Sequence, residues 1–163
     1  MYAADPDVAF VEPSFRVRAV AVPNDPMYSS LWGMPRIKAP DFWDEGTGDT
    51  NILAAVIDTG ILRTHEDLAA NMWRNPGETG PDRSGGDKAT NGIDDDGNGY
   101  IDDVHGVSVV GDASTHSGEP MDHHGHGSHV AGVIAAQAFN GRGGIGVAFN
   151  AQIMAVRAAQ YSG

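Results

Sequence analysis

The sequence has 163 residues, 40% of them hydrophobic, with a formal net charge of −12 and no cysteine. This length and apolar fraction suit a single folded domain, and the lack of cysteine excludes a disulfide framework, thiol catalysis and zinc–thiolate sites. Half of the 22 acidic residues lie between Trp73 and His124. Such a block repels nucleic acid and anionic membranes, so neither of these is an expected partner, and it attracts cations.

The ends of the chain carry few signals of their own. No run approaches the roughly 20 apolar residues of a transmembrane helix, and the N-terminus lacks the basic and apolar regions of a signal peptide. Either the protein is cytosolic or the chain does not begin where its gene product begins. The last residues, "AQIMAVRAAQYSG", indicate a strand with nothing after it to cover it, so we expect a fragment at both ends.

The N-terminal third predicts one extended segment, one short helix and one strand. Residues 8–22 alternate apolar and polar in places and indicate extended chain, followed by a turn at "PNDP". Residues 36–46 predict a short helix with Pro40 near its start. The apolar run 51–60, "NILAAVIDTG", predicts a strand buried on both faces of a parallel sheet.

The rest of the chain predicts a loop, a helix and a second strand. Residues 74–122 are rich in Gly, Asp and Asn and indicate a long irregular loop. Residues 126–139 predict a helix, and 151–159 a second buried strand. Strand, loop, helix and strand in this order imply an α/β layer architecture with a right-handed crossover. The residues expected to face inward from the helix are Val130, Val133, Ile134 and Gln137.

Asp58 and His126 are the candidate catalytic residues. Asp58 follows the apolar run at the carboxyl end of the first strand, where catalytic groups gather in parallel sheets. The alternative for a lone aspartate there is a cap for the following turn. His126 opens a helix rich in small apolar residues, which would hold its imidazole in one place. A buried carboxylate and an oriented imidazole are two of the three groups of a catalytic triad, in which the imidazole activates a serine hydroxyl.

These residues resemble a known family. "AAVIDTGI" with Asp58, followed by "HGSHVAG" with His126, looks like the subtilisin-like serine proteases, or subtilases, whose chain order is Asp, His, Ser. The segments "NDPMYSSLWGMPRIKAPDFWD" and "GIGVAFNAQIMAVRA" resemble the same family, although Phe149 stands where proline is usual. The resemblance covers nearly the whole chain. It implies the N-terminal half of a three-layer α/β fold with a mainly parallel sheet.

The resemblance also implies a division of the chain and a location. Residues 1–22 look like the end of an inhibitory propeptide, which would act as an intramolecular inhibitor, and residues 23–163 like the N-terminal part of the peptidase domain. The alternative for the first segment is an N-terminal edge strand of the same domain. The family further implies a secreted monomer that acts on protein or peptide substrates.

The acidic insert, about residues 74–122, predicts a calcium site. "DDDGNGYIDD" matches the ligand half of an EF-hand loop, in which alternate oxygens converge on one ion. His105 stands where an EF-hand has a bidentate glutamate, and no amphipathic helices flank the segment, so a calcium site within the insert is favoured over an EF-hand protein. A solvated acidic turn is the alternative. Asp103 and Glu78 are additional candidates, and the predicted ligands are Asp94, Asp96, Asn98 and Asp102.

A second calcium site follows from the resemblance alone. Subtilases commonly assemble a strong site where this chain has Asp25, Asp67 and Asn140, completed by backbone carbonyls of the 138–144 loop. Calcium that binds only the folded state would stabilise these loops by mass action.

The remaining histidines carry weaker signals. His129 is expected to support packing, while His123 and His124 are expected to be solvated, and Asp122 is a candidate for orienting the His126 loop. A zinc site in this cluster would need a carboxylate or an H-E-x-x-H spacing that the segment lacks. His65 and His116 suggest no particular chemistry.

The nucleophile is not recognisable within the 163 residues. None of the nine serines stands in the G-T-S-x-A setting of the family's nucleophile. Three hypotheses follow: a calcium-stabilised serine endopeptidase represented here by an inactive fragment, a calcium-binding module without catalysis, and a zinc hydrolase. A G-T-S-x-A motif beyond Gly163 would distinguish the first from the second.

Overall fold

The computed structural model describes residue 7, residues 22–111 and residues 119–160. The predicted propeptide segment and the extended run 8–22 therefore lie almost wholly outside the described residues. The strands are β1 (Leu53–Asp58), β2 (Gly106–Ser108) and β3 (Gln152–Arg157), and the α-helices are α1 (Gly33–Arg36), α2 (Ala39–Phe42) and α3 (His126–Ala135). Short 3-10 turns are η2 (Tyr28–Ser30), η3 (Ala69–Asn71), η4 (Pro76–Glu78) and η5 (Lys88–Thr90).

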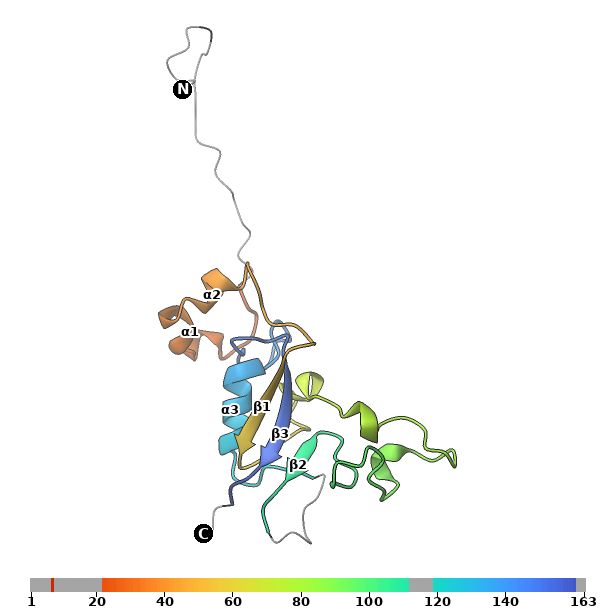
Figure 1. Ribbon diagram of the computed structural model, residues 1–163. Helices are drawn as coiled ribbons and strands as arrows, with labels where there is room; N and C mark the ends of the chain where they lie inside the picture. The colour runs from red at the N-terminus through yellow and green to blue at the C-terminus, as the bar shows by residue number, and fades with distance from the viewer. Residues whose placement is uncertain (1–6, 8–21, 112–118, 161–163) are drawn as a thin grey trace.

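The three strands form one parallel sheet in the order β1-β3-β2 (Figure 1). Asp58 of β1 is level with Arg157 of β3, and Ser108 of β2 pairs with the same arginine, so the carboxyl ends of all three strands meet at one edge. Helix α3 lies between β1 and β3 in the chain and packs on the sheet. The predicted α/β class and parallel sheet are thus confirmed.

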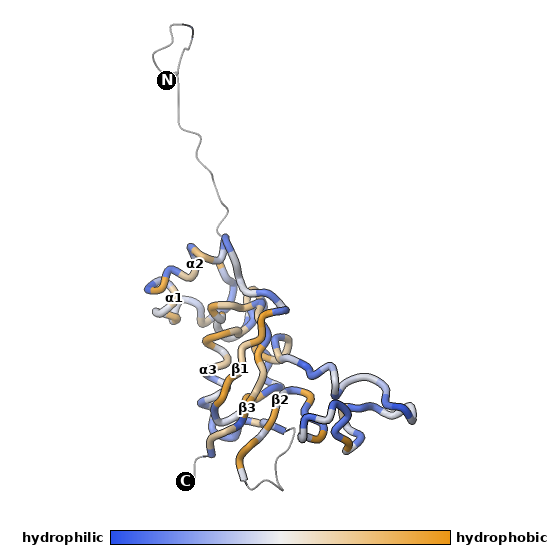
Figure 2. The backbone as a smooth tube through the Cα atoms, in the orientation of Figure 1, coloured by the Kyte–Doolittle hydropathy of each residue, from blue (hydrophilic) through white to orange (hydrophobic). Residues whose placement is uncertain are grey.

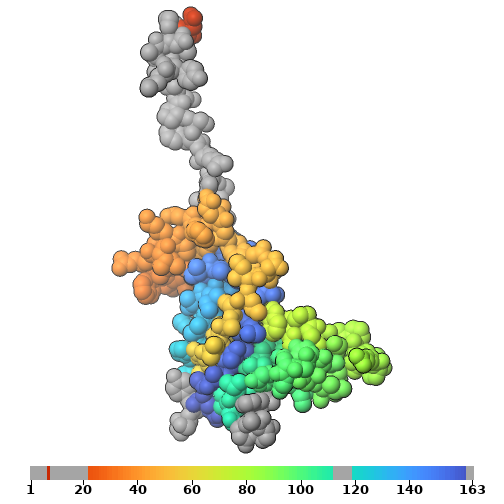
Figure 3. Space-filling view, viewed as in Figure 1, coloured from red at the N-terminus to blue at the C-terminus, as the bar shows by residue number. Residues whose placement is uncertain are grey.

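The core lies between α3 and one face of the sheet. Small residues on the inner side of the helix, Ala131 and Ala135, are fully buried and let it approach Val56 and Ile153 of the strands. In Figure 2 the strands are coloured mainly as apolar residues, whereas the acidic insert is coloured mainly as polar residues. The insert projects from the sheet as a separate lobe in Figure 3.

The two predicted strands are slightly shorter than expected, and β1 is buried on one face only. Val56 is 3% exposed and faces α3, whereas Leu53 and Ile57 on the opposite face are 42% and 70% exposed. The prediction of burial on both faces is therefore wrong for the part of the chain that the structure describes, since no described element covers that second face.

The predicted helix 36–46 is found only as the four-residue α2, with the four-residue α1 ending at Arg36 just before it. Between them Lys38 adopts a left-handed conformation with φ of 56°. The left-handed Lys38 separates the two helices, and Pro40 is the second residue of α2, where a proline is tolerated because the first N–H groups of a helix have no partner within it.

The predicted helix 126–139 ends at Ala135. The backbone turns away at Ala136 (ψ of 140°), and the N–H of Gln137 donates to the carbonyl of Asp67 instead of continuing the helix. Val133, expected to face inward, is 51% exposed.

The segment 74–122 is less irregular than predicted. Strand β2 lies within it and joins the sheet at the outer edge of β3. Its three residues are too few to show an alternating pattern in the sequence.

Candidate active site

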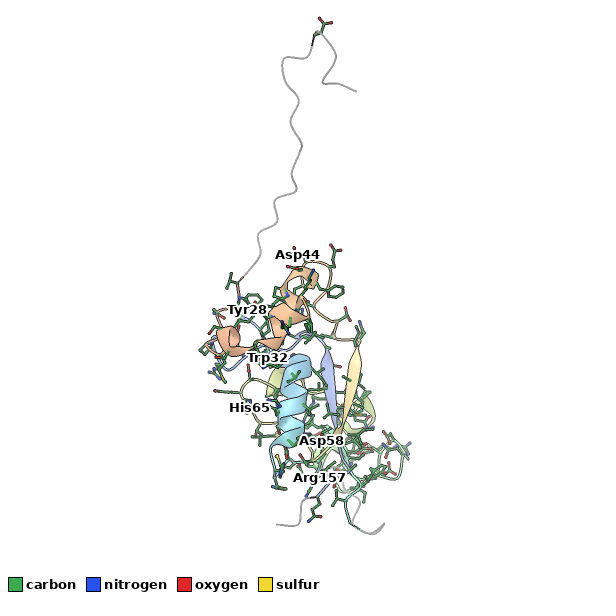
Figure 4. The ribbon with its side chains drawn as sticks, turned by 90° about the vertical axis from the view of Figure 1, so that its left-hand side faces the viewer. Tyr28, Trp32, Asp44, Asp58, His65 and Arg157 are labelled. Atoms are coloured by element: carbon green, nitrogen blue, oxygen red, sulfur yellow. The ribbon has the colours of Figure 1, made fainter. Side chains whose placement is uncertain are left out.

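Asp58 and His126 form a hydrogen-bonded pair at the carboxyl edge of the sheet. The imidazole Nδ1 lies 2.7 Å from Oδ1 and 2.9 Å from Oδ2 of Asp58. The backbone N–H of Thr59 donates to the same Oδ1 at 2.7 Å. The Asp58 side chain is 17% exposed and that of His126 is 56% exposed, so the carboxylate is held within the protein while the imidazole reaches the surface. Figure 4 shows Asp58 beside the first turn of α3.

Glycines bring the two elements close enough for this bond. Gly125, the residue before α3, has φ of 97°, a conformation that favours glycine. A side chain at Gly127 would overlap the carbonyl oxygen of Gly60 and lie 3.1 Å from Cβ of Asp58. The start of α3 therefore rests directly on the end of β1, and His126 is placed over Asp58 by contact between backbones.

The electrostatics of the pair favour an ionised carboxylate. Burial raises the pKa of Asp58, but the hydrogen bonds from His126 and from the Thr59 backbone outweigh burial and bring the pKa below its ordinary value. An ionised Asp58 accepts the Nδ1–H, which leaves the lone pair of the imidazole on Nε2. That nitrogen is then the proton acceptor of the pair.

A third carboxylate, Asp122, organises the loop before α3. It is 8% exposed and accepts five hydrogen bonds. Its donors are the Thr59 hydroxyl, the backbone N–H groups of His124, Gly125 and Ser128, and the Ser128 hydroxyl. The suggested orienting role of Asp122 thus has a structural basis, whereas Thr59 and Ser128 escaped sequence analysis because each is a small polar residue with no pattern of its own.

The other histidines do not build a metal site. His123 and His124 are exposed, as expected, but His129 is exposed too, so its predicted packing role is wrong for the described residues. Within the described ranges, no histidine joins a group of three or more metal-ligating side chains, which gives the zinc hypothesis no support. His116 lies outside these ranges.

Three carboxylates meet inside the acidic insert. Ligand atoms of Glu78, Asp96 and Asp103 all lie within 4.8 Å of one another. Two amides hold this cluster. Asn75 Nδ2 donates to Asp96 and Asp103 at 2.9 and 2.8 Å, and Asn98 Nδ2 donates to the same two carboxylates at 3.3 and 3.0 Å.

Glu78 is the unusual member of this cluster. It is fully buried, and its Oε2 has no hydrogen-bond partner among the described residues. Burial, together with the charges of Asp103 and Asp96, raises its pKa despite backbone N–H donors from Asp95 and Asp96. Burial and the charge of Asp96 also raise the pKa of Asp103. A divalent cation among these oxygens would relieve that repulsion.

The predicted calcium ligands of the insert are only partly brought together. Asp96 and Asn98 belong to the cluster around Glu78. Asp94 instead accepts the backbone N–H groups of Gly97, Asn98 and Gly99 and shapes the turn. Asp102 has φ of 53° and accepts the N–H of Gly92 at 3.2 Å.

The second predicted set, Asp25, Asp67 and Asn140, lies around the loop after α3. Asn140 Nδ2 donates to Asp67 Oδ1 at 2.7 Å, and Asp67 Oδ2 accepts the N–H of Gly144 at 3.1 Å. Asp25 Oδ2 accepts the N–H of Phe139 at 2.9 Å. Both aspartates are 4% exposed, and Asp25 Oδ1 is buried without a partner among the described residues.

The fold and the pair together define a class. An aspartate at the end of a parallel strand, bonded to the Nδ1 of a histidine that opens a helix, has the geometry of the Asp–His part of a serine hydrolase triad. The sequence model of the Subtilase family matches residues 49–163. The chain belongs to the subtilase family, and the resemblance stated from the sequence is confirmed.

Several relatives match most of this chain. An extracellular basic protease of Dichelobacter nodosus is 38% identical over 95% of the chain and 26% of its own length. A thermophilic serine proteinase of Bacillus sp. (strain AK1) is 32% identical over 98% of the chain and 31% of its own length. The chain thus spans under a third of the length of these relatives.

One solved structure shows the same fold. Proteases from Pseudoalteromonas arctica PAMC 21717 superpose with a TM-score of 0.57 at 24% identity, over 84% of this chain and 39% of that chain. At this identity the likeness concerns the fold alone.

Proposed function

We propose that this chain is the N-terminal part of a serine endopeptidase in which Asp58 and His126 activate a serine that follows Gly163. The observation that carries the proposal is the 2.7 Å contact between Asp58 Oδ1 and His126 Nδ1 at the carboxyl edge of the sheet. The length of the relatives supports a further segment, since this chain spans 26% of the Dichelobacter nodosus protease.

The chemistry of the pair follows from its geometry. Asp58 holds the Nδ1–H and stabilises the imidazolium that forms during reaction. Nε2 of His126 takes the proton of the serine hydroxyl as the oxygen attacks a peptide carbonyl. It then returns that proton to the leaving amine. The chain itself contributes the base and its orientation, and the nucleophile comes from outside it.

Peptide hydrolysis by the full-length protein tests this proposal. His126→Ala is expected to lower kcat by several orders of magnitude, because residual catalysis without one triad member is only about 10³–10⁴ over water. His129→Ala is the matched control, since it removes an exposed imidazole one turn further along α3. Equal activity of the two variants would refute the role of His126. An inactive parent protein lacking a downstream serine would favour the calcium-binding module without catalysis.

Calcium is proposed as a structural ion in the insert. The residues that fit it are Asp96 from the predicted set, with Glu78 and Asp103, because the orphaned Oε2 of Glu78 points to a missing positive partner. Asn98 turns its amide NH₂ toward two of these carboxylates and stays a predicted ligand. Asp94 and Asp102 stay predicted ligands. Calcium would stabilise the folded insert when bound. Calcium titration by calorimetry should show binding that Glu78→Gln weakens and that Asp82→Asn, which changes a half-buried carboxylate elsewhere in the same insert, does not weaken.

The second set is proposed as another calcium site. Asp25, Asp67 and Asn140 surround the loop after α3, and the partnerless Asp25 Oδ1 is again an oxygen that a cation would satisfy. Loss of one of two calcium equivalents in Asp25→Asn would support this site, whereas unchanged stoichiometry would refute it.

The remaining proposals concern the whole protein. We propose protein or peptide substrates, residues 1–22 as the end of an inhibitory propeptide, and a secreted monomer. Extracellular location of the Dichelobacter nodosus relative and of a halolysin-like extracellular serine protease of Natrialba magadii supports secretion. Among the described residues, none of the helices is long and apolar enough to cross a membrane. Detection of protein beginning between about Phe15 and Asn24 in culture medium would support both maturation and secretion.

A further inference from the structure

Hydrogen bonds through neighbouring residues connect the buried Asp122 carboxylate to both Asp58 and His126. We infer that Asp122 is a positioning residue that fixes His126 relative to Asp58 through Thr59 and the first turn of α3. This inference rests on the proposed peptidase function for its kinetic consequence. Its structural consequence, a change in the Asp58–His126 hydrogen bond, does not depend on that function.

The first link runs through Thr59. The Thr59 hydroxyl donates to Asp122 Oδ1 at 2.9 Å and accepts the N–H of Gly127, next to His126, at 2.9 Å. A hydroxyl has a single proton, so giving it to Asp122 leaves the lone pairs for Gly127. The backbone N–H of Thr59 meanwhile donates to Asp58 Oδ1 at 2.7 Å. One residue therefore ties Asp122, Asp58 and the start of α3 together.

The second link runs through the start of the helix. The residue before α3 is Gly125, which has no side chain to cap the first N–H groups. Asp122 caps the helix instead, since its Oδ2 accepts the backbone N–H of Ser128 at 2.9 Å and the Ser128 hydroxyl at 2.6 Å. Oδ1 accepts the N–H groups of His124 and Gly125 at 2.8 and 2.9 Å. The backbone on both sides of His126 is thereby held by one carboxylate.

The ionised form matters because every partner of Asp122 is a donor. An asparagine of the same shape has one acceptor oxygen and an NH₂ group, so one end of its amide would face donors that it cannot bond. Buried donors without an acceptor are costly, and the loop would move to find water or other acceptors. His126 moves with that loop.

The kinetic test compares two like substitutions in the full-length protein. Asp122→Asn is expected to lower kcat by about 10-fold to 100-fold with KM changed less than about twofold, since a displacement near 1 Å costs about this much. Asp82→Asn is the control, because Asp82 also accepts several hydrogen bonds, from Ser84, Gly86 and Asn91, but lies in the insert. An unchanged kcat in Asp122→Asn, or an equal loss in both variants, would overturn the inference.

A double-mutant cycle tests the route through Thr59. Thr59→Val removes the hydroxyl and should lower kcat, while Thr59→Ser keeps the hydroxyl and should preserve it. Because Asp122 acts through Thr59 and also through the start of α3, adding Asp122→Asn to Thr59→Val should lower kcat further, but by less than the product of the two single effects. Effects that multiply would overturn the route. The two Thr59 variants also decide the question if Asp122→Asn fails to fold.

A spectroscopic measurement separates this inference from the proposed function. The proton on His126 Nδ1, observed by NMR in the full-length protein, should shift and exchange faster with water in Asp122→Asn and in Thr59→Val than in Asp82→Asn. An unchanged resonance in both would refute positioning by Asp122. An inactive parent protein would refute the peptidase function and would leave the positioning of His126 by Asp122 to be decided by this resonance.

Discussion

Gly127→Ala perturbs the contact between α3 and β1 at the candidate active site. The added Cβ would overlap the carbonyl oxygen of Gly60 and lie 3.1 and 3.3 Å from Cβ and Oδ1 of Asp58. Ordinary contacts between carbon and oxygen are about 3.3 Å or more, so the helix start must retreat by about 1 Å. Overpacking of this kind costs about 1–3 kcal/mol of unfolding free energy, and a 1 Å displacement lowers kcat by about 10²-fold.

Gly132→Ala is the matched control in the same helix. A Cβ there meets nothing within 4 Å, and alanine favours a helix over glycine by about 0.8–1.0 kcal/mol. Denaturant unfolding and peptide hydrolysis of the full-length protein should therefore show a destabilised, nearly inactive Gly127→Ala and an active Gly132→Ala of equal or greater stability. Full activity of Gly127→Ala would refute the close contact on which the geometry of the pair depends.

The other predictions concern charge and metal. Protein held in free calcium at 100 times the dissociation constant should lose about 2.7 kcal/mol of unfolding free energy for each site when EDTA removes the calcium. Thermal unfolding measures this loss, and Glu78→Gln should show a smaller one. Burial raises the pKa of Asp122, but its hydrogen bonds outweigh burial and lower the pKa below its ordinary value. The ionised Asp122 therefore stabilises the folded protein above about pH 4, the ordinary pKa of an aspartate, and this stabilisation is lost as the pH falls toward the pKa of Asp122 in the folded protein. The melting temperatures of wild type and Asp122→Asn should accordingly converge in acid, and a gap that is constant from pH 3 to 7 would contradict this.

The elements that the sequence predicted well are those with strong local patterns. β1 and β3 are apolar runs bounded by turns, and α3 has helical spacing behind a glycine-flanked histidine. Asp58 and His126 could be proposed because each stands at a defined end of such an element. Their 2.7 Å contact across 68 residues could only be inferred from the family resemblance.

The features that sequence analysis missed depend on contacts between distant segments. The hydrogen bond from Thr59 to Asp122 spans 63 residues, and neither residue stands in a distinctive local pattern. Glu78, named from the sequence only as an additional candidate, joins Asp96 through the folding of the insert, whereas the loop pattern had favoured Asp94 for a direct ligand role. Burial of β1 on one face also escaped prediction, because an apolar run does not reveal which elements will cover it.

The most direct test of the central claim is the kcat of the Asp58→Asn variant of the full-length protein on a peptide substrate. Asparagine keeps the shape of Asp58 but cannot hold the Nδ1–H of His126, so the imidazole adopts the wrong tautomer and kcat should fall by about 10⁴-fold. A kcat within about tenfold of wild type would contradict the assignment of Asp58 and His126 as a catalytic pair.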